Sequence, residues 1–236
     1  KVEYDFARVS SFAADTPGVR ANFASKGSTD ETGTSGRIGV QYDVSEDVNV
    51  YANYARGYKG PAINVFFNMR AFDTIPLQPE ESDAFELGLK SRLLDNRLVL
   101  NVAAFDTSYS GFQTTSFDTV AGSIVSRLIN AGDVSTKGIE ADFTARPTAA
   151  LTLSGGAAYT KAKIDTYNCP AGSPASCAAH NGKTLPYAPE WKLNLAANYD
   201  VALPSMPFDM TLNTAYGWQS DTQFDIDQNP LAIQPE

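Results

Sequence analysis

The amino-acid sequence predicts an all-β chain, an antiparallel up-and-down segment of a transmembrane β-barrel. Three observations predict this fold: long runs of alternating apolar and polar side chains, connections that are short and long in turn, and aromatic residues near the ends of the apolar faces. Successive side chains of a strand point to opposite sides, so this alternation gives each strand one apolar and one polar face.

Residues 137–160 show the alternation most clearly, in two consecutive runs joined by a four-residue turn. In the first run, Ile139, Ala141 and Phe143 share one face, whereas Glu140 and Asp142 share the other. The second run, 151–160, has the same form. The two runs predict a pair of long antiparallel strands, each with one face suited to something other than water.

About ten strands are expected from this kind of pattern. In chain order the strand-like runs are 2–6, 19–23, 38–44, 48–54, 85–89, 98–112, 127–130, 137–146, 151–160, 191–201 and 208–218. The run 98–112 is less regular, because Leu98 and Val102 keep one phase while Phe105 and Tyr109 take the other. A β-bulge near Ala103–Ala104 would reset the phase. No segment predicts a helix.

The connections between these runs fall into two classes. Short turns are expected at 45–47, 94–96, 147–150 and 204–207, and long loops at 60–79, 115–126, 166–190 and from 220 onward. In an antiparallel meander alternate connections lie at the same end of the sheet, so all tight turns fall at one end and all long loops at the other. Transmembrane barrels have this asymmetry, with short periplasmic turns and long extracellular loops.

Composition excludes two classes of protein. Of the 236 residues, 43% are hydrophobic, but no apolar run reaches the roughly 18 residues of a membrane helix, which excludes a helical membrane protein. The formal net charge of −9 and the absence of a basic stripe argue against a nucleic-acid partner.

A soluble β-sandwich would show the same period of two with its apolar face turned inward. Strand length favours the barrel, since runs of about 10 to 12 residues match a tilted membrane strand and sandwich strands usually have about 5 to 6 residues. Aromatic residues also favour it, because interfacial girdles place them near the ends of the apolar faces. They are Tyr4, Phe6, Tyr54, Tyr58, Tyr159, Trp191, Tyr199, Phe208, Tyr216 and Trp218.

Three segments resemble the TonB-dependent outer-membrane receptors. Residues 51–61, YANYARGYKGP, are similar to the family's strand that rises into an extracellular loop. Residues 77–90, LQPEESDAFELGLK, resemble its Pro-Glu and Glu-Leu-Gly-x-Lys pattern, and residues 130–142, NAGDVSTKGIEAD, its Asn-Ala-Gly and Lys-Gly-Ile-Glu pattern. In this order and spacing the resemblance extends from about Arg37 to Trp218.

The resemblance implies that residues 1–236 are part of one barrel domain, 22-stranded in the family, in the outer membrane of a Gram-negative bacterium. It implies active import of a scarce nutrient, such as a ferric siderophore or cobalamin. The expected partners are outer-membrane lipid, an extracellular small-molecule ligand such as a metal chelate, and periplasmic TonB, reached through a plug domain. We expect the plug and the C-terminal closing strand of the family to be absent from this chain.

The loop after residue 58 is the candidate ligand-capture site. Tyr58, Phe66, Phe67 and Arg70 bring aromatic rings and a cation together, a combination that holds aromatic or anionic ligands by stacking and charge. A loop that packs on its neighbours across the barrel mouth is the interpretation that the sequence favours, and ligand capture is the functional alternative.

Cys169 and Cys177, in the loop 166–190, predict a disulfide that closes a loop of about nine residues and stabilises it by about 2.5 kcal/mol. A zinc site with His180 is the weaker alternative, because no fourth ligand is found. A disulfide between the two cysteines fits an extracytoplasmic compartment.

Asp225, Asp227 and Asn229 alternate like the start of a calcium loop, but Pro230 stands where such a loop needs glycine, so we expect a solvated acidic loop and no metal. Glu140, Asp142 and Arg146 on the polar faces are expected to line a hydrated lumen and contact a plug.

The sequence contains no nucleophile elbow, phosphate loop or dinucleotide fingerprint, and His180 is the single histidine. We therefore expect neither an enzyme nor a cofactor. Two alternatives to active transport stay open: a passive porin, and a secreted β-rich adhesion or sugar-binding module.

Overall fold

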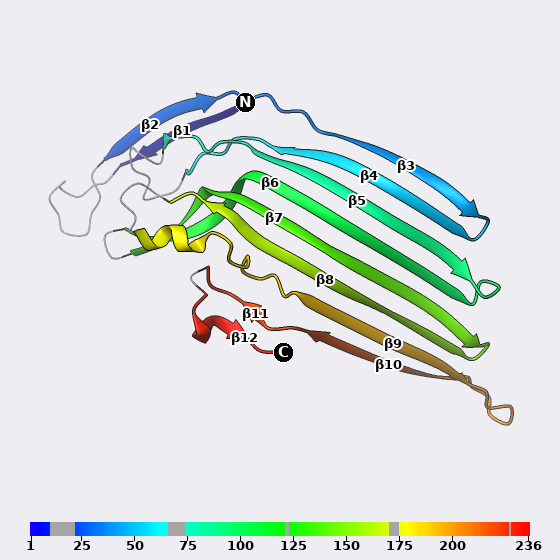
Figure 1. The fold of residues 1–236 in the computed structure, drawn as a ribbon. Helices are drawn as coiled ribbons and strands as arrows, with labels where there is room; N and C mark the ends of the chain where they lie inside the picture. Colours follow the sequence, from blue (N-terminus) through cyan, green and yellow to red (C-terminus); the bar gives the residue numbers. More distant parts are fainter. Residues whose placement is uncertain (10–21, 66–73, 121–122, 170–174, 227) are drawn as a thin grey trace.

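The computed structural model describes every residue except 10–21, 66–73, 121–122, 170–174 and 227. Its main feature is one curved antiparallel sheet in which each strand pairs with its neighbours in the sequence, in the order β3 to β10 (Figure 1). The strands are β3 (Gly36–Ser45), β4 (Val48–Lys59), β5 (Glu80–Leu93), β6 (Leu98–Val120), β7 (Ser123–Thr148), β8 (Leu151–Tyr167), β9 (Trp191–Val201) and β10 (Met210–Gln219). This is the predicted up-and-down order, and the all-β fold is confirmed.

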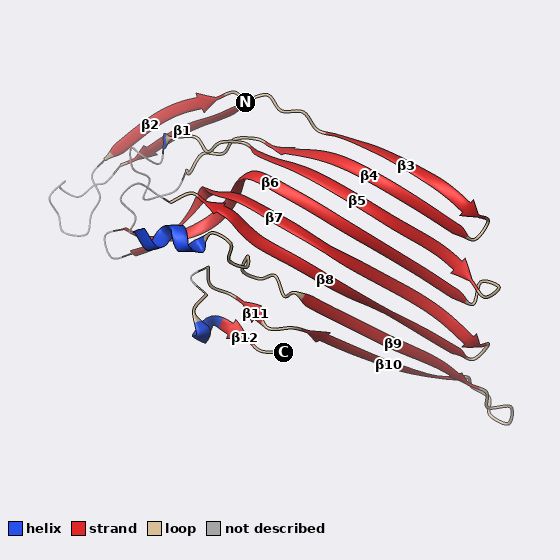
Figure 2. Cartoon of the chain, in the orientation of Figure 1, coloured by secondary structure: helices blue, strands red, loops and turns tan. Residues whose placement is uncertain are grey.

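The remaining elements are short and lie toward the loop end of the sheet (Figure 2). They are the hairpin of β1 (Val2–Arg8) and β2 (Phe23–Thr29), the pair of β11 (Thr222–Gln223) and β12 (Ile233–Gln234), and two 3₁₀ turns, η2 (Ala175–His180) and η3 (Pro230–Ala232). In the described part of the chain, no helix is long and apolar enough to cross a membrane.

The predicted asymmetry of the connections is confirmed. The turns that join β3 to β4, β5 to β6, β7 to β8 and β9 to β10 lie together at the right of Figure 1, and the long connections lie at the left. One expected loop is wrong, because β6 and β7 extend through 115–126 and pair as far as Val120 and Ser123. Residues 127–130 are accordingly part of β7. The sequence of 115–126 does not alternate regularly between apolar and polar residues, so alternation could not reveal this part of the hairpin.

The bulge expected at Ala103–Ala104 is also wrong. β6 pairs without a break from Leu98 to Tyr109 against β5 and β7, and the register shifts only between Tyr109 and Gln113. The apolar residues of β6 change from one face to the other because the surroundings of the inner face change along the strand, not because the strand is interrupted. Phe105 faces the polar side and its ring occupies the space above Gly138, where an added Cβ would lie 2.9 Å from the ring.

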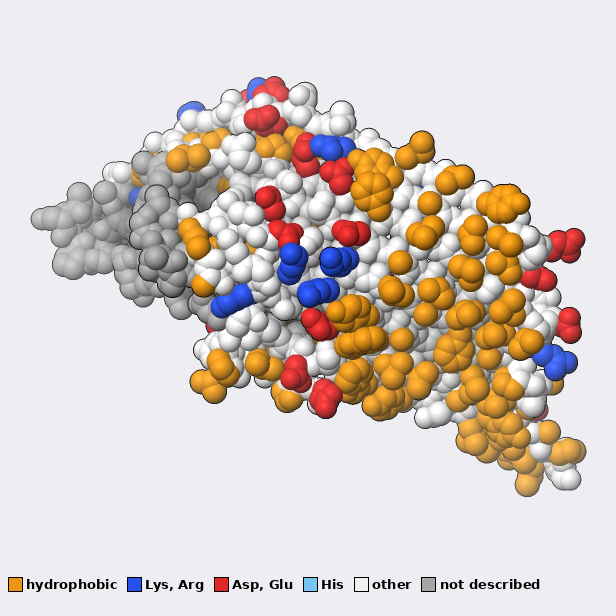
Figure 3. Space-filling model, viewed as in Figure 1, with side chains coloured by type: hydrophobic (Ala, Val, Ile, Leu, Met, Phe, Trp, Pro, Cys, Tyr) orange, Lys and Arg blue, Asp and Glu red, His pale blue; other side chains and the backbone are white. Residues whose placement is uncertain are grey.

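The apolar face of the sheet is uncovered. Ile38, Leu87 and Leu212 lie on it, with exposed fractions of 71%, 63% and 53%. Figure 3 shows this face as a broad hydrophobic belt toward the turn end. Phe143 and Leu195 approach each other above Gly155 on this same face, within one layer and not between two. A sandwich would bury these side chains between two layers, whereas the described part of the chain places them on one uncovered layer, as expected for a barrel wall.

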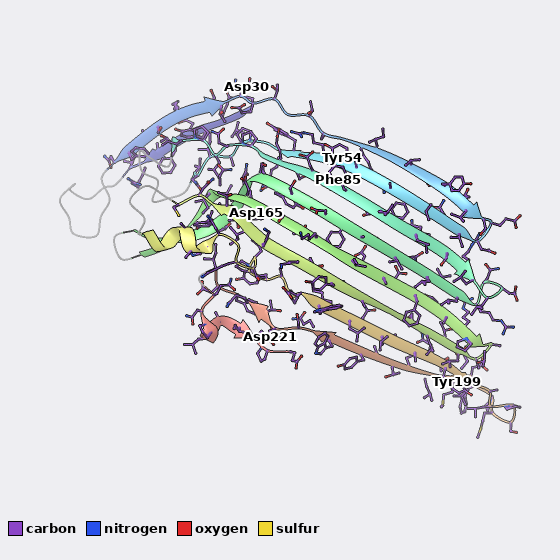
Figure 4. All side chains as sticks on the ribbon, viewed as in Figure 1. Asp30, Tyr54, Phe85, Asp165, Tyr199 and Asp221 are labelled. Carbon is purple, nitrogen blue, oxygen red and sulfur yellow. The ribbon has the colours of Figure 1, made fainter. Side chains whose placement is uncertain are left out.

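Aromatic pairs mark the loop-side limit of the belt. The rings of Tyr54 and Phe85 on β4 and β5 are 4.9 Å apart (Figure 4). Those of Tyr159 and Trp191 on β8 and β9 are 4.8 Å apart. Tyr216, in contrast, is the Cα partner of Leu195 inside the belt. Aromatic girdles flank the apolar band of membrane barrels at both interfaces. The sheet therefore has an apolar outer face whose loop-side limit is marked by aromatic residues.

Candidate functional site

The three segments that carry the resemblance meet in space at the loop ends of β4 to β7. We term the group Lys59, Gly60, Gln78, Glu80, Gln113 and Asn130 the rim cluster. Gly60 follows β4, Gln78 and Glu80 stand at the start of β5, and Gln113 and Asn130 are Cα partners across β6 and β7. Residues up to 71 positions apart in the sequence are thereby fixed relative to one another.

Asn130 joins three strands through its side-chain amide. Its Nδ2 donates to the carbonyl oxygens of Gly111 at 2.6 Å and Gln78 at 2.9 Å, and its Oδ1 accepts from the Gln78 backbone N–H at 2.8 Å. An amide side chain that both donates and accepts can replace a missing backbone partner on each side. This explains why asparagine opens the third resembling segment.

Gln113 completes the cluster from the opposite side. Its side chain is 6% exposed, and its Nε2 donates to the carbonyl oxygens of Gly60 and Gln78, each at 2.9 Å. Its backbone N–H donates to Glu80 Oε2 at 2.6 Å, and Lys59 Nζ lies 3.5 Å from that same oxygen. Buried polar groups with several partners fix one geometry, so the cluster sets where the loop after Lys59 leaves and re-enters the sheet.

Two glycines allow the strands to approach closely here. Gly111 and Gly132 have φ values of +65° and +118°, a region that other residues rarely adopt. A Cβ at Gly111 would lie 2.6 Å from the Pro79 carbonyl oxygen, and a Cβ at Gly132 would collide with the Thr166 carbonyl oxygen. Glycine is therefore required at both positions by backbone conformation and by space.

Both stems of the capture loop are held by further contacts. Asn64 Nδ2 donates to the Leu128 carbonyl oxygen at 2.6 Å, and its Oδ1 accepts from the Leu128 N–H at 2.7 Å. The Leu77 N–H donates to the Ala62 carbonyl oxygen at 2.7 Å, and the Leu77 side chain is buried. The structure thus positions the base of the loop whose middle, 66–73, lies outside the described residues.

We expect Asn130→Ala to loosen this loop base, because it removes the side-chain partner of the Gln78 N–H and of the Gly111 carbonyl oxygen, and one of the two side-chain donors to the Gln78 carbonyl oxygen. The expected loss is about 1 to 3 kcal/mol of local stability, seen as faster proteolytic cleavage within 60–79. Asn198→Ala on the inner face of β9 is the matched control. Equal cleavage rates in both variants would contradict the role assigned to Asn130.

The predicted capture residues are only partly visible. Phe66, Phe67 and Arg70 lie outside the described residues, so their role stays a prediction. Tyr58 shares the outward phase of Tyr54, and its ring occupies the space beside Gly33. Its hydroxyl is buried and has no hydrogen-bond partner in the described part of the chain. The structure therefore does not bring Tyr58 to the inner face.

The other predicted positions have the following places. Cys169 is in the disulfide-bonded state, and the Cys177 side chain lies outside the described part, so the pairing stays a prediction. His180 ends η2, with its ring 4.8 Å from that of Tyr167. Asn229 caps η3 by accepting from the Leu231 N–H at 3.0 Å. Asp225 borders a pocket, whereas Asp227 is not described.

The polar face of the sheet forms an inner wall. Tyr51 and Lys90 lie on this wall with Lys90 Nζ 5.4 Å from the tyrosine ring centre, and Asn101 Nδ2 donates to Asp142 Oδ2 at 2.8 Å. A hollow of about 450 Å³ opens on it, bordered among others by Arg37, Gln41, Asn49, Asn53 and Glu86. Glu140 shares this face, as the alternation predicts.

Sequence reasoning missed an aromatic pocket of about 460 Å³ at the loop end. Val134 and Ile164, which share the phase of the inner wall, form its floor and are each 2% exposed. The rings of Tyr187 and Phe224 meet edge to face at 5.0 Å beside it, and Phe112 and Tyr167 complete its aromatic lining. These four rings come from the interior of β6, the end of β8 and two loops, so no periodic pattern could group them.

Tyr187 also has a strained backbone, with φ +65°. Its N–H donates to the Gln223 carbonyl oxygen at 2.8 Å, which holds the segment before β9 against the segment after β10. Non-glycine residues with positive φ persist where surrounding structure over-determines them, and such positions concentrate at functional sites. The side chain is 70% exposed, so the ring is presented to solvent at the pocket edge.

A family model described as "TonB dependent receptor-like, beta-barrel" matches residues 4–235. The metal-pseudopaline receptor CntO of Pseudomonas aeruginosa is 31% identical over 138 residues, which cover 54% of this chain and 16% of that protein. The probable TonB-dependent siderophore receptor PiuA of Acinetobacter baumannii is 24% identical over 213 residues, covering 87% of this chain and 26% of that protein. The chain thus spans about a quarter or less of these relatives' length.

Solved structures show the same fold. The ferric yersiniabactin uptake receptor FyuA of Yersinia pestis superposes with a TM-score of 0.72 at 18% identity, over 91% of this chain and 30% of that one. The siderophore receptor PiuA of Acinetobacter baumannii superposes with a TM-score of 0.67 at 21% identity, over 96% of this chain and 30% of that one. These relatives are receptors and not enzymes, as predicted.

Proposed function

Because the chain belongs to the TonB-dependent receptor β-barrel family, we propose that it forms one side of the wall of an outer-membrane receptor in a Gram-negative bacterium. The receptor takes up a scarce nutrient. The family match over residues 4–235 carries this proposal, and the uncovered apolar belt with its aromatic edge supports the membrane placement. The complete barrel is 22-stranded, and the plug and the closing strand come from outside residues 1–236.

The proposed substrate is a small metal chelate such as a ferric siderophore. The names of the relatives, a metal-pseudopaline receptor and siderophore receptors, support this class. The aromatic pocket supports it physically, because exposed rings at the loop end offer stacking surface to an organic chelator.

The residues of this chain act as scaffold and as part of the capture surface. The rim cluster holds the base of the loop that carries Phe66, Phe67 and Arg70, and the aromatic pocket lies at the loop end of β6 to β8. The inner wall presents polar groups such as Glu86 and Asp142 to a hydrated lumen and to the plug. Periplasmic TonB supplies the energy by acting on the plug.

The proposal is tested by uptake in cells. A strain lacking the gene, grown with limiting iron, is given radioactive iron chelated by a panel of siderophores, with and without the intact protein and with and without TonB. Uptake of at least one chelate that needs both the protein and TonB is the expected result. Uptake of small hydrophilic solutes without TonB would instead establish a passive porin.

The capture surface has its own prediction. We expect Tyr187→Ala with Phe224→Ala, and separately Phe66→Ala with Phe67→Ala, to weaken chelate binding about tenfold each, because each pair removes two stacking rings. Tyr216→Ala, on the outer face, is the control that leaves binding unchanged. Affinity is measured by quenching of intrinsic fluorescence in the intact protein. A pair whose loss leaves affinity unchanged lies outside the binding site.

A further inference from the structure

The outer face of β7 and β8 carries a cluster of three lysines. Figure 3 shows Lys and Arg side chains on the loop side of the apolar belt, with carboxylates beside them. Lys137 and Lys161 are direct Cα partners, and Lys163 lies two residues beyond Lys161 on the same face. Like charges directly opposite each other on a sheet are destabilising. The whole chain has a net charge of −9, so this local concentration of positive charge opposes its overall balance.

The cluster is only partly neutralised from within. Lys163 Nζ lies 2.7 Å from Asp165 Oδ1. Burial raises the pKa of the Asp165 carboxyl, but hydrogen bonds from Lys163 and Ser135 and the charge of Lys137 outweigh it and hold the pKa below its ordinary value. Asp106 is the Cα partner of Lys137, yet no ion pair joins Lys137 or Lys161 to another residue of the described chain. Both side chains are exposed.

Another cation of the outer face, three strands away from β7, shows the opposite arrangement. Arg56 on β4 lies 2.6 Å from Glu81 and 3.2 Å from Asp83. Its charge is therefore already matched by two carboxylates of β5. Lys137 and Lys161, in contrast, are exposed and pair with no carboxylate of the described residues, so they are available to an external anion.

The depth of the cluster identifies that anion. Lys161 follows Tyr159 by two residues, about 7 Å along the strand, and Tyr159 belongs to the aromatic pair that ends the apolar belt. Aromatic rings of membrane proteins lie at the headgroup level. The ammonium groups therefore reach the layer of lipid phosphates, and the compact charge of lysine suits phosphate.

We propose that Lys137, Lys161 and Lys163 form a binding site for the phosphate groups of an anionic lipid headgroup in the outer leaflet. The site rests on the proposed membrane placement, and it is independent of which nutrient the receptor takes up. The lipid phosphate lies between the opposed Lys137 and Lys161 and relieves their repulsion. Lys163, held by Asp165, borders the site.

The test measures lipid binding to the intact protein in neutral detergent by native mass spectrometry. The probe is diphosphoryl lipid A, with monophosphoryl lipid A and phosphatidylcholine as comparison lipids. A double variant, Lys137→Gln with Lys161→Gln, is expected to bind diphosphoryl lipid A about 25-fold more weakly, since each lysine near an anionic lipid surface contributes about fivefold. The affinity for phosphatidylcholine, which carries no phosphomonoester, is expected to be unchanged by this double variant.

The matched control is Lys90→Gln with Lys192→Gln, which removes the same charge from the inner wall. The proposal is overturned if both double variants lose affinity equally, if neither loses it, or if inorganic phosphate competes at the concentration of the lipid. Its failure is distinct from failure of the proposed function, because chelate uptake is scored separately in cells. Loss of uptake with retained lipid selectivity leaves this site in place.

Discussion

Leu195→Arg is expected to destabilise the protein in lipid by about 2 to 4 kcal/mol, the loss seen for arginine near the midplane of membrane barrels. Leu195 lies on the outer face of β9, four residues beyond Trp191. At about 3.3 Å per residue and a tilt of about 40°, this places it about 10 Å below the aromatic edge of a band that is about 25 Å tall. The charge cannot reach water easily from there.

The measurement is a denaturant titration of the intact protein folded into lipid vesicles. Asn194→Arg is the control, because Asn194 lies on the inner face one residue away. A loss of less than about 1 kcal/mol is expected for it. If the two arginines destabilise equally, the assignment of faces on β9 is wrong.

Gly132→Ala is expected to be the most damaging small substitution at the rim, with a loss of about 3 kcal/mol or more. The φ of +118° is strained for any residue with a Cβ, and such strain costs roughly 1 to 3 kcal/mol. The added methyl group would also collide with the Thr166 carbonyl oxygen, so β7 and β8 must separate. Separation would disturb Asn130 and the loop base that it holds.

Substitutions at two other glycines separate the cost of backbone strain from the cost of the steric collision. Gly182 has φ +80° with open space around it, so Gly182→Ala measures backbone strain alone. Gly217 has no neighbouring atom within 4 Å of an added Cβ and no positive φ, so Gly217→Ala should be nearly neutral. The expected order of destabilisation, from largest to smallest, is Gly132→Ala, Gly182→Ala and Gly217→Ala. Thermal unfolding of the three variants measures it. A near-neutral Gly132→Ala would show that the strand approach at the rim is not tight.

Sequence reasoning predicted the parts of the fold that repeat. Alternation located the strands whose two faces meet different environments, such as β7 and β8, and the short turns followed from the ends of those runs. It failed where the environment changes along one strand. Phe105 is an apolar residue on the polar inner face, where it fills the space above Gly138. The alternation rule assumes that each face of a strand is either apolar or polar throughout, so it interprets this residue as a bulge.

The site was less predictable because it depends on contacts between distant segments. The three resembling segments were visible, but only the register of β6 and β7 shows that Gln113 and Asn130 face each other and reach Gln78. The aromatic pocket combines Tyr187 with Phe224, whose rings meet next to the backbone hydrogen bond from Tyr187 to Gln223. Neither residue lies in an alternating run, so nothing in the sequence related them.

The central claim is that the apolar face of the sheet meets lipid and the polar face meets water. Spin labels placed one at a time at 193–198 of β9 in the intact protein, reconstituted in lipid, test it most directly. The labels at Leu193, Leu195 and Ala197 should collide preferentially with oxygen, and those at Asn194, Ala196 and Asn198 with a water-soluble nickel complex. A profile without a period of two, or with the phases exchanged, would contradict the claim.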